Sequence, residues 1–199
     1  MFSISKRVFD VFLSLTVIIT LFPVFLLLFM YIKVDSPGPI LFRQKRVGKG
    51  KEEFEILKFR TMKIEAPKDM PTHLLDKPEA YITRSGKFLR KTSLDELPQF
   101  FNILKGDMSL IGPRPALWNQ FDLIEERDKY KANDVMPGLT GLAQINGRDE
   151  LPIEMKAKID GGYVEHMTML LDMKILVWTF VYVFKSEGVR EGEKATQKL

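Results

Sequence analysis

The fold is decided by an apolar stretch near the N-terminus, Val11–Ile32, which reads VFLSLTVIITLFPVFLLLFMYI. As one straight helix these 22 residues would reach ~33 Å, enough to cross a hydrocarbon core of ~30 Å. Pro23 lies in the middle of the stretch, where proline removes a backbone hydrogen bond and clashes with the preceding turn. The sequence therefore predicts two helices with a sharp bend at Pro23.

Charges on both sides of this stretch indicate how it meets a membrane. Lys6 and Arg7 precede it, and Lys33 follows it, with further basic residues at positions 43, 45 and 46. Because cytoplasmic flanks of membrane segments carry the excess of Lys and Arg, both ends are expected on the cytoplasmic side. This favours a re-entrant hairpin over a single proline-kinked span, which stays open as the alternative. A cleaved signal peptide is disfavoured because the apolar run is long and no A-x-A site follows it.

The composition narrows the class of protein. The chain has 199 residues, of which 45% are hydrophobic and 28% charged, so it is expected to fold. It has no cysteine, which excludes disulfides, thiolate metal sites and a cysteine nucleophile, and its two histidines are far apart. Residues 1–63 hold 11 Lys and Arg against five Asp and Glu. Basic charge beside an apolar segment suits anionic lipid or an anionic substrate, and no basic helix with interleaved aromatic residues points to nucleic acid.

Beyond the apolar stretch the sequence predicts an α+β, mainly helical domain. Strands at 40–47 and 54–59 around a turn at 48–51 predict a β-hairpin. Further helices are expected at 86–91, 98–105, 118–131 and 155–185, the last with an interruption at Gly161-Gly162. We therefore divide the chain into a re-entrant membrane helix (1–35), a cytoplasmic domain (36–186) and a polar tail (187–199).

The last helix contains a second apolar stretch, Ile175–Phe184. At 10 residues it is too short to cross a bilayer but suits a helix lying in the membrane interface. Trp178 and Tyr182 are four residues apart, so they share a face at the depth that aromatic side chains prefer. A buried core helix is the alternative.

The most informative polar run is Arg90–Asn102, RKTSLDELPQFFN. Its structural interpretation is a helix start, either a capping box formed by Ser93 and Glu96 or a start with Pro98 as the first helical residue. Its functional interpretation rests on two adjacent carboxylates, Asp95 and Glu96, beside basic residues. A helix start and neighbouring cations lower carboxylate pKa values and attract phosphate, which suits an ionised nucleophile that attacks phosphorus.

Two loops supply further candidates for binding a ligand. Arg114 lies between two prolines, which stiffen the backbone and would hold its guanidinium as a planar clamp for phosphate, although an ordinary turn is an equal alternative. The loop at 136–148 combines turn residues with polar side chains that include Gln144 and Arg148. Walker, GxGxxG and GxSxG motifs and an Asp-x-Asp chelating pair are all missing, so the common pattern of nucleotide-sugar glycosyltransferases is missing too.

Taken together, the motifs closely resemble the bacterial sugar transferase family, the small monotopic phosphoglycosyl transferases that begin polyprenyl-linked glycan assembly. The resemblance runs from about residue 6 to 186. Its motifs are Lys6-Arg7-x-Phe9-Asp10, Lys58-Phe59-Arg60-Thr61-Met62, Ser93-Leu94-Asp95-Glu96-Leu97, Gly106-Asp107-Met108-Ser109, Gly112-Pro113-Arg114-Pro115, Pro137-Gly138-Leu139-Thr140-Gly141, Asn146-Gly147-Arg148 and Leu171-Asp172-x-Lys174-Ile175.

The resemblance implies a mechanism and a location. Asp95 would attack the β-phosphate of a UDP-sugar, UMP would leave, and polyprenol (undecaprenyl) phosphate would then take the sugar phosphate from the aspartyl intermediate. Mg²⁺ would be held by Asp95 and Glu96, and the catalytic domain would face the cytoplasm at the bacterial inner membrane. The expected phosphate- and substrate-binding residues are Lys58, Arg60, Arg90, Arg114, Gln144, Arg148 and Asp160.

Three positions depart from the family pattern. Phe22 stands where a Ser often precedes the helix-breaking proline, Leu142 stands where Trp is common, and Gly161-Gly162 replaces a bulkier pair. Two other functions stay open: an inert membrane-anchored scaffold of a glycan-assembly complex, and a single-pass protein that binds anionic lipid. Besides the two substrates and membrane lipids, a second copy of the chain or other glycan-pathway enzymes are candidate partners. Release of UMP from a UDP-sugar separates the enzyme from both alternatives.

Overall fold

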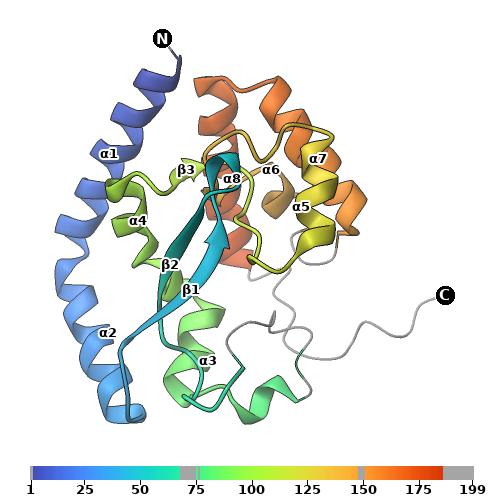
Figure 1. Cartoon of the computed structure of the whole chain (residues 1–199). Coiled ribbons are helices and arrows are strands. Elements are labelled where there is room, and N and C mark those ends of the chain that lie inside the picture. The colour runs from blue at the N-terminus through green and yellow to red at the C-terminus, as the bar shows by residue number, and fades with distance from the viewer. Residues whose placement is uncertain (1, 68–74, 76, 148–150, 186–199) are drawn as a thin grey trace.

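The computed structural model of the chain describes residues 2–67, 75, 77–147 and 151–185. They form a mainly helical fold with two small sheets, as the sequence predicts in outline. In Figure 1 a bent pair of helices runs along one side of the molecule, the hairpin crosses the middle, and α5 and α7 lie on the opposite side. The helices are α1 (Phe2–Thr20), α2 (Phe22–Asp35), α3 (Arg84–Lys91), α4 (Gln99–Lys105), α5 (Phe121–Asp128), α6 (Leu142–Ile145), α7 (Ile153–Glu165) and α8 (Met169–Lys185), and the strands are β1 (Leu41–Val47), β2 (Glu53–Phe59), β3 (Ser109–Ile111) and β4 (Gly138–Thr140).

The predicted bend in the apolar stretch is present, with an angle of 63° between α1 and α2. The break lies at Leu21, and Pro23 occupies the first turn of α2. Proline is tolerated there because the first N–H groups of a helix have no partner inside the helix. The chain therefore breaks two residues before the proline. Thr20 donates its hydroxyl to the backbone oxygen of Thr16 at 2.8 Å, which supplies a hydroxyl contact ahead of the bend where Phe22 has none.

The bent pair has an outward apolar face. Among the described residues no single helix is both long and apolar enough to cross a bilayer, whereas α1 and α2 together reach that length and composition. Exposed apolar side chains follow one stripe of α1 at intervals of three or four residues, the spacing of a single helix face. This stripe consists of Ile4, Val8, Phe12, Leu15 and Ile19.

The other face of α1 is bonded to the rest of the molecule. Lys6 forms an ion pair with buried Asp172 of α8 at 2.6 Å. Arg7 donates to the backbone oxygen of Ile103 in α4 at 2.6 Å. The carboxylate of Asp10 accepts a bond from the backbone N–H of Leu110 in β3 at 3.1 Å. These polar bonds fix α1 against the elements that carry the site.

The hairpin is confirmed, and a second small sheet was not predicted. β1 and β2 pair antiparallel from Leu41 opposite Phe59 to Val47 opposite Glu53. β3 and β4 pair in parallel, and each has three residues, too few for an alternating pattern to show in the sequence. A Cβ atom on Gly138 would lie 2.1 Å from the backbone nitrogen of Gly112, so the close approach of these two segments requires glycine.

Two of the predicted helices have other boundaries in the structure. The helix expected at 118–131 is the shorter α5, and the helix expected at 155–185 is two helices, α7 and α8, separated at 166–168. Gly161-Gly162, the predicted interruption, lies inside α7. A Cβ atom on Gly161 would lie 2.5 Å from the Cβ of Tyr130. This glycine therefore allows close packing against the segment after α5 instead of ending the helix.

Candidate active site

Asp95 and Glu96 lie in a tight turn between α3 and α4. The turn is η4, a single 3₁₀ turn over Leu94–Glu96, and Ser93 enters it with a φ of 55°. In this left-handed conformation the Ser93 side chain makes no cap hydrogen bond. The predicted capping box needs that bond and is wrong. Helix α4 begins at Gln99, after Pro98, close to the alternative start that the sequence offered.

Glu96 is held by two cations from distant parts of the chain. Its Oε1 atom lies 2.9 Å from Nζ of Lys58 on β2 and 2.7 Å from Nη2 of Arg114, which follows β3. The Glu96 side chain is only 13% exposed. Burial lowers the pKa of Lys58, and the nearby Glu96 carboxylate opposes that shift. The structure thus brings together three residues that the sequence assigned to one site.

Asp95 is placed differently from its neighbour. Among the described residues none makes a hydrogen bond or an ion pair with its carboxylate. Burial raises the pKa of Asp95 above its usual value of 3.8, Lys58 opposes the shift, and Glu96 adds to it. The expectation that this environment lowers the pKa was wrong, because loss of hydration outweighs the cations that surround the carboxylate.

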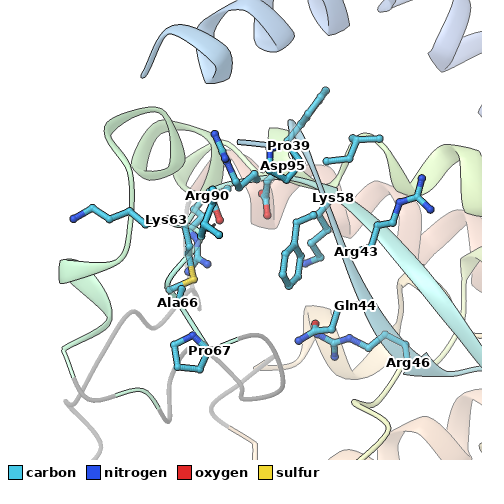
Figure 2. A pocket seen from close by; sticks show the side chains of 17 residues that line it. Pro39, Arg43, Gln44, Arg46, Lys58, Lys63, Ala66, Pro67, Arg90 and Asp95 are labelled. Carbon is cyan, nitrogen blue, oxygen red and sulfur yellow. Dashed lines mark hydrogen bonds between the residues drawn. The ribbon is translucent and has the colours of Figure 1, made fainter. Parts of the chain in front are cut away.

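Asp95 lines a basic cavity of about 390 Å³ between the hairpin and α3. Figure 2 shows its carboxylate between the side chains of Arg90 and Lys58 at the cavity wall. The sequence had singled out only part of the basic lining. The cations of this basic cavity are Arg43, Arg46, Lys58, Arg60, Lys63 and Arg90.

Arg46 could have been found from the hairpin register. Phe42 lies opposite Lys58 in the sheet, and residues two apart on a strand point to the same face. Phe42, Gln44 and Arg46 therefore share the face of Lys58. Arg46 donates to Oε1 of Gln44 and to the backbone oxygen of Pro115 at 3.1 Å, which ties the cavity wall to the loop that carries Arg114.

Arg60 and Arg90, which were also predicted to bind phosphate, line this cavity and are held by different partners. Arg60 is 5% exposed, and its guanidinium donates to the backbone oxygens of Ser36 and Pro37 at the end of the bent helix pair. It therefore anchors the junction between α2 and the hairpin. Arg90 extends from α3 and donates from Nε to the hydroxyl of Thr61 at 2.9 Å, which holds it beside Asp95.

Glu96 and Arg114 line a second cavity on the other side of the turn. This apolar cavity has a volume of about 380 Å³ and lies between α1, α8 and the turn. Gln144 of α6, a predicted site residue, also lines it. Gln144 is 8% exposed, and both polar atoms of its side chain lack a hydrogen-bond partner. Asp95 and Glu96 therefore border two cavities of opposite character.

The structure does not bring Asp160 to either cavity. Its side chain is 1% exposed, and its Oδ2 atom accepts from Nε and Nη2 of Arg127 at 2.9 Å and 2.6 Å. The Nη1 atom of Arg127 donates to the backbone oxygen of Arg114 at 2.8 Å. Asp160 is therefore a buried partner of Arg127 and lines neither of these two cavities, so its predicted contact with substrate stays a prediction. Sequence reasoning missed Arg127, because nothing local marks a pair 33 residues apart.

The remaining predicted residues fall in three places. Arg148 lies outside the described residues. Trp178 is 57% exposed on α8, and its position in a membrane interface stays a prediction. Tyr182 lines the apolar cavity and is half-buried, although it lies one turn further along the same helix.

A family model and individual relatives of known sequence both indicate one protein family. The family model described as bacterial sugar transferase matches residues 1–186. The chain is 38% identical to "Uncharacterized sugar transferase EpsL" of Bacillus subtilis (strain 168), over 97% of this chain and 94% of that protein. It is 38% identical to the UDP-glucose:undecaprenyl-phosphate glucose-1-phosphate transferase of Xanthomonas campestris pv. campestris, over 92% of this chain and 39% of that protein. A UDP-N-acetylgalactosamine-undecaprenyl-phosphate N-acetylgalactosaminephosphotransferase of Aeromonas hydrophila is 36% identical, over 95% of this chain and 46% of that protein. The chain spans less than half the length of the last two relatives.

Proposed function

Because the chain belongs to the bacterial sugar transferase family, we propose that it transfers a sugar phosphate from a UDP-sugar to polyprenol phosphate and releases UMP. The names of two relatives specify a UDP-sugar and undecaprenyl phosphate. One observation carries the proposal: the Asp95 carboxylate has no hydrogen-bond partner among the described residues and borders a cavity lined by cations. A carboxylate in that position is suited to attack a phosphate that the cations hold.

In the first proposed step, Asp95 becomes covalently attached to the sugar phosphate. A carboxylate oxygen forms a bond to the β-phosphorus, and the bond from that phosphorus to the bridging oxygen breaks. UMP leaves with the bridging oxygen and the electron pair of the broken bond. The attacking form of Asp95 is the ionised carboxylate, which needs no general base to activate it.

The cations around the turn support this step by their charge. Lys58 and Arg90 flank Asp95 and offset the negative charge of the donor diphosphate. Glu96 keeps Lys58 and Arg114 close together despite their like charges, because it lies within 2.9 Å of one and 2.7 Å of the other. Arg114 can therefore present its planar fork to phosphate oxygens.

In the second proposed step, the acceptor takes the sugar phosphate from Asp95. A phosphate oxygen of polyprenol phosphate forms a bond to the phosphorus, the bond from phosphorus to the Asp95 oxygen breaks, and the carboxylate is regenerated. The product is a polyprenol diphosphate sugar, the starting lipid of a bacterial surface glycan or glycoprotein glycan.

Magnesium is proposed to be held by Asp95 and Glu96 together with donor phosphate oxygens. Among the described residues no three His, Asp or Glu side chains cluster as a complete metal site. Mg²⁺ does not need one, since it commonly binds one or two carboxylates and completes its shell with phosphates and water. The Asp95 carboxylate, which has no protein partner among the described residues, fits this role. When bound, the ion would offset charge on the diphosphate.

The bent helix pair is proposed to enter and leave the cytoplasmic leaflet from the same side. The apolar stripe of α1 gives it a face suited to lipid, and the 63° bend turns α2 away from the line of α1. Arg60 holds the end of α2 next to the basic cavity. The cavity would then lie close to the lipid surface, where a soluble donor and a lipid acceptor can meet.

The test is UMP release by the purified full chain in detergent. A panel of UDP-sugars, with polyprenol phosphate and Mg²⁺, should yield UMP from at least one donor, and EDTA should stop the release. With the Asp95→Asn variant, no donor should give UMP or a covalent sugar phosphate adduct. Failure of the wild-type protein to release UMP from any donor would favour the inert scaffold instead.

A further inference from the structure

The apolar cavity has the lining of a lipid site. Its walls include Leu13 and Val17 of α1 and Leu176 and Phe180 of α8. Phe180 is also 60% exposed, so the cavity is continuous with the exposed apolar face of α8. An apolar chain could therefore reach the cavity from the exposed apolar face of α8.

Polar and charged side chains also line this cavity. Glu96 and Arg114 reach it from one side, and Gln144 reaches it from α6. The Gln144 side chain is 8% exposed, yet neither its Nε2 nor its Oε1 atom has a hydrogen-bond partner. Buried amides are nearly always hydrogen-bonded, so an orphaned one in a cavity wall indicates that a ligand supplies the partner.

From these contacts we infer that the apolar cavity is the acceptor site, in which the amide of Gln144 donates to a phosphate oxygen of polyprenol phosphate. The inference rests on the proposed function. The acceptor has an anionic head and a long apolar tail, which match the two kinds of side chain that line the cavity: Arg114 and Gln144 for the head, and apolar residues of α1 and α8 for the tail. The basic cavity, in contrast, suits a nucleoside diphosphate.

This assignment places the two substrates on opposite sides of the turn that carries Asp95 and Glu96. Asp95 lines the basic cavity, and Glu96 lines the apolar one. The donor would load Asp95 from the first side, and the acceptor phosphate would approach from the second. Gln144 then determines acceptor binding and has no part in donor binding.

Steady-state kinetics of three variants test the acceptor site. Gln144→Leu removes the amide with little change in volume, and Val17→Trp fills the tail region. Ile153→Trp is the matched control, because Ile153 is also β-branched, is 38% exposed at the start of α7 and lines neither cavity. For each variant we would measure the KM for polyprenol phosphate, the KM for the UDP-sugar, and the burst of UMP with the donor alone.

We expect the KM for polyprenol phosphate to rise roughly tenfold or more in Gln144→Leu and in Val17→Trp, with the KM for the donor within about twofold of wild type. Ile153→Trp should match wild type. The UMP burst also shows whether each variant is folded. If Val17→Trp gives no burst, the acceptor site is tested by Gln144→Leu alone.

Two results would overturn the acceptor site. One is an unchanged KM for the acceptor in Gln144→Leu with a normal burst. The other is a raised KM for the donor in the same variant, which would assign the amide to the nucleotide sugar. Either result leaves the proposed function in place, whereas absence of any burst from the wild-type protein would remove the proposed function itself.

Discussion

The Arg127–Asp160 pair offers the sharpest separation between stability and activity. The two side chains are 4% and 1% exposed, and the pair is joined through Nε at 2.9 Å and Nη2 at 2.6 Å. The third donor of Arg127, Nη1, holds the backbone oxygen of Arg114 at 2.8 Å. We compare Asp160→Asn, which removes one charge, with the double variant Arg127→Met/Asp160→Leu, which removes both.

The expected magnitudes follow from burial. Asp160→Asn leaves the Arg127 charge buried without its counter-charge, which costs about 3–5 kcal/mol, and for a chain of this size that lowers Tm by about 6–20 °C. The double variant leaves neither charge of the pair buried, so its free energy of unfolding should lie within about 1–2 kcal/mol of the wild-type value. It also leaves the Arg114 carbonyl without its donor, a bond worth about 1 kcal/mol net. Arg114 is then held less firmly at Glu96.

The assay is thermal unfolding in detergent together with the rate of the UMP burst. Asp160→Asn should lose mainly stability, whereas the double variant should regain stability and still have a slower burst. Lys51→Met is the control, because its ion pair with Asp128 is 53% and 41% exposed and should contribute little. A double variant with a wild-type burst would refute the positioning role of Arg127, and a wild-type Tm for Asp160→Asn would refute the energetic reasoning.

Four further predictions concern the proposed chemistry and the bend. Asp95→Asn should lose burst activity by about 10³-fold or more, measured as UMP and as radiolabelled adduct, without a change in Tm. Glu96→Gln removes a negative neighbour that raises the pKa of Asp95, so this pKa should fall. In a plot of burst rate against pH, the loss of activity on the acidic side should then move to lower pH, and a shift to higher pH would contradict this. Arg114→Lys should lose about 10- to 100-fold in the burst rate, because ammonium keeps the charge but not the planar fork. In intact cells, an impermeant thiol reagent should leave Ser3→Cys unlabelled, and adding Pro23→Leu should straighten the helix and make part of the population reactive.

The features that sequence reasoning found are local ones. A proline in an apolar run, alternation around a short turn and two adjacent acids each lie within a few residues, so the bend, the hairpin and the Asp95-Glu96 pair could be predicted. The exact break at Leu21 could not, because it depends on whether Pro23 ends one helix or begins the next.

The features that sequence reasoning missed depend on distant contacts. Lys58 and Arg114 reach Glu96 from 38 residues before it and 18 residues after it, and their pairing becomes visible only in the folded chain. Asp160 was assigned to substrate only through the family resemblance. Its burial against Arg127 comes from the packing of α7 on α5, which periodicity does not reveal.

The geometry of the turn explains how two neighbouring acids can serve different purposes. Successive side chains in a 3₁₀ turn are about 120° apart around the axis, so Asp95 and Glu96 cannot face the same way. Glu96 offsets the repulsion between Lys58 and Arg114 and keeps both cations near the turn. Asp95 has no such bonds among the described residues, which suits the attack on phosphorus proposed above. Exchanging the two acids would preserve the composition of the turn but place the shorter carboxylate between the cations, so neither role would be filled as well.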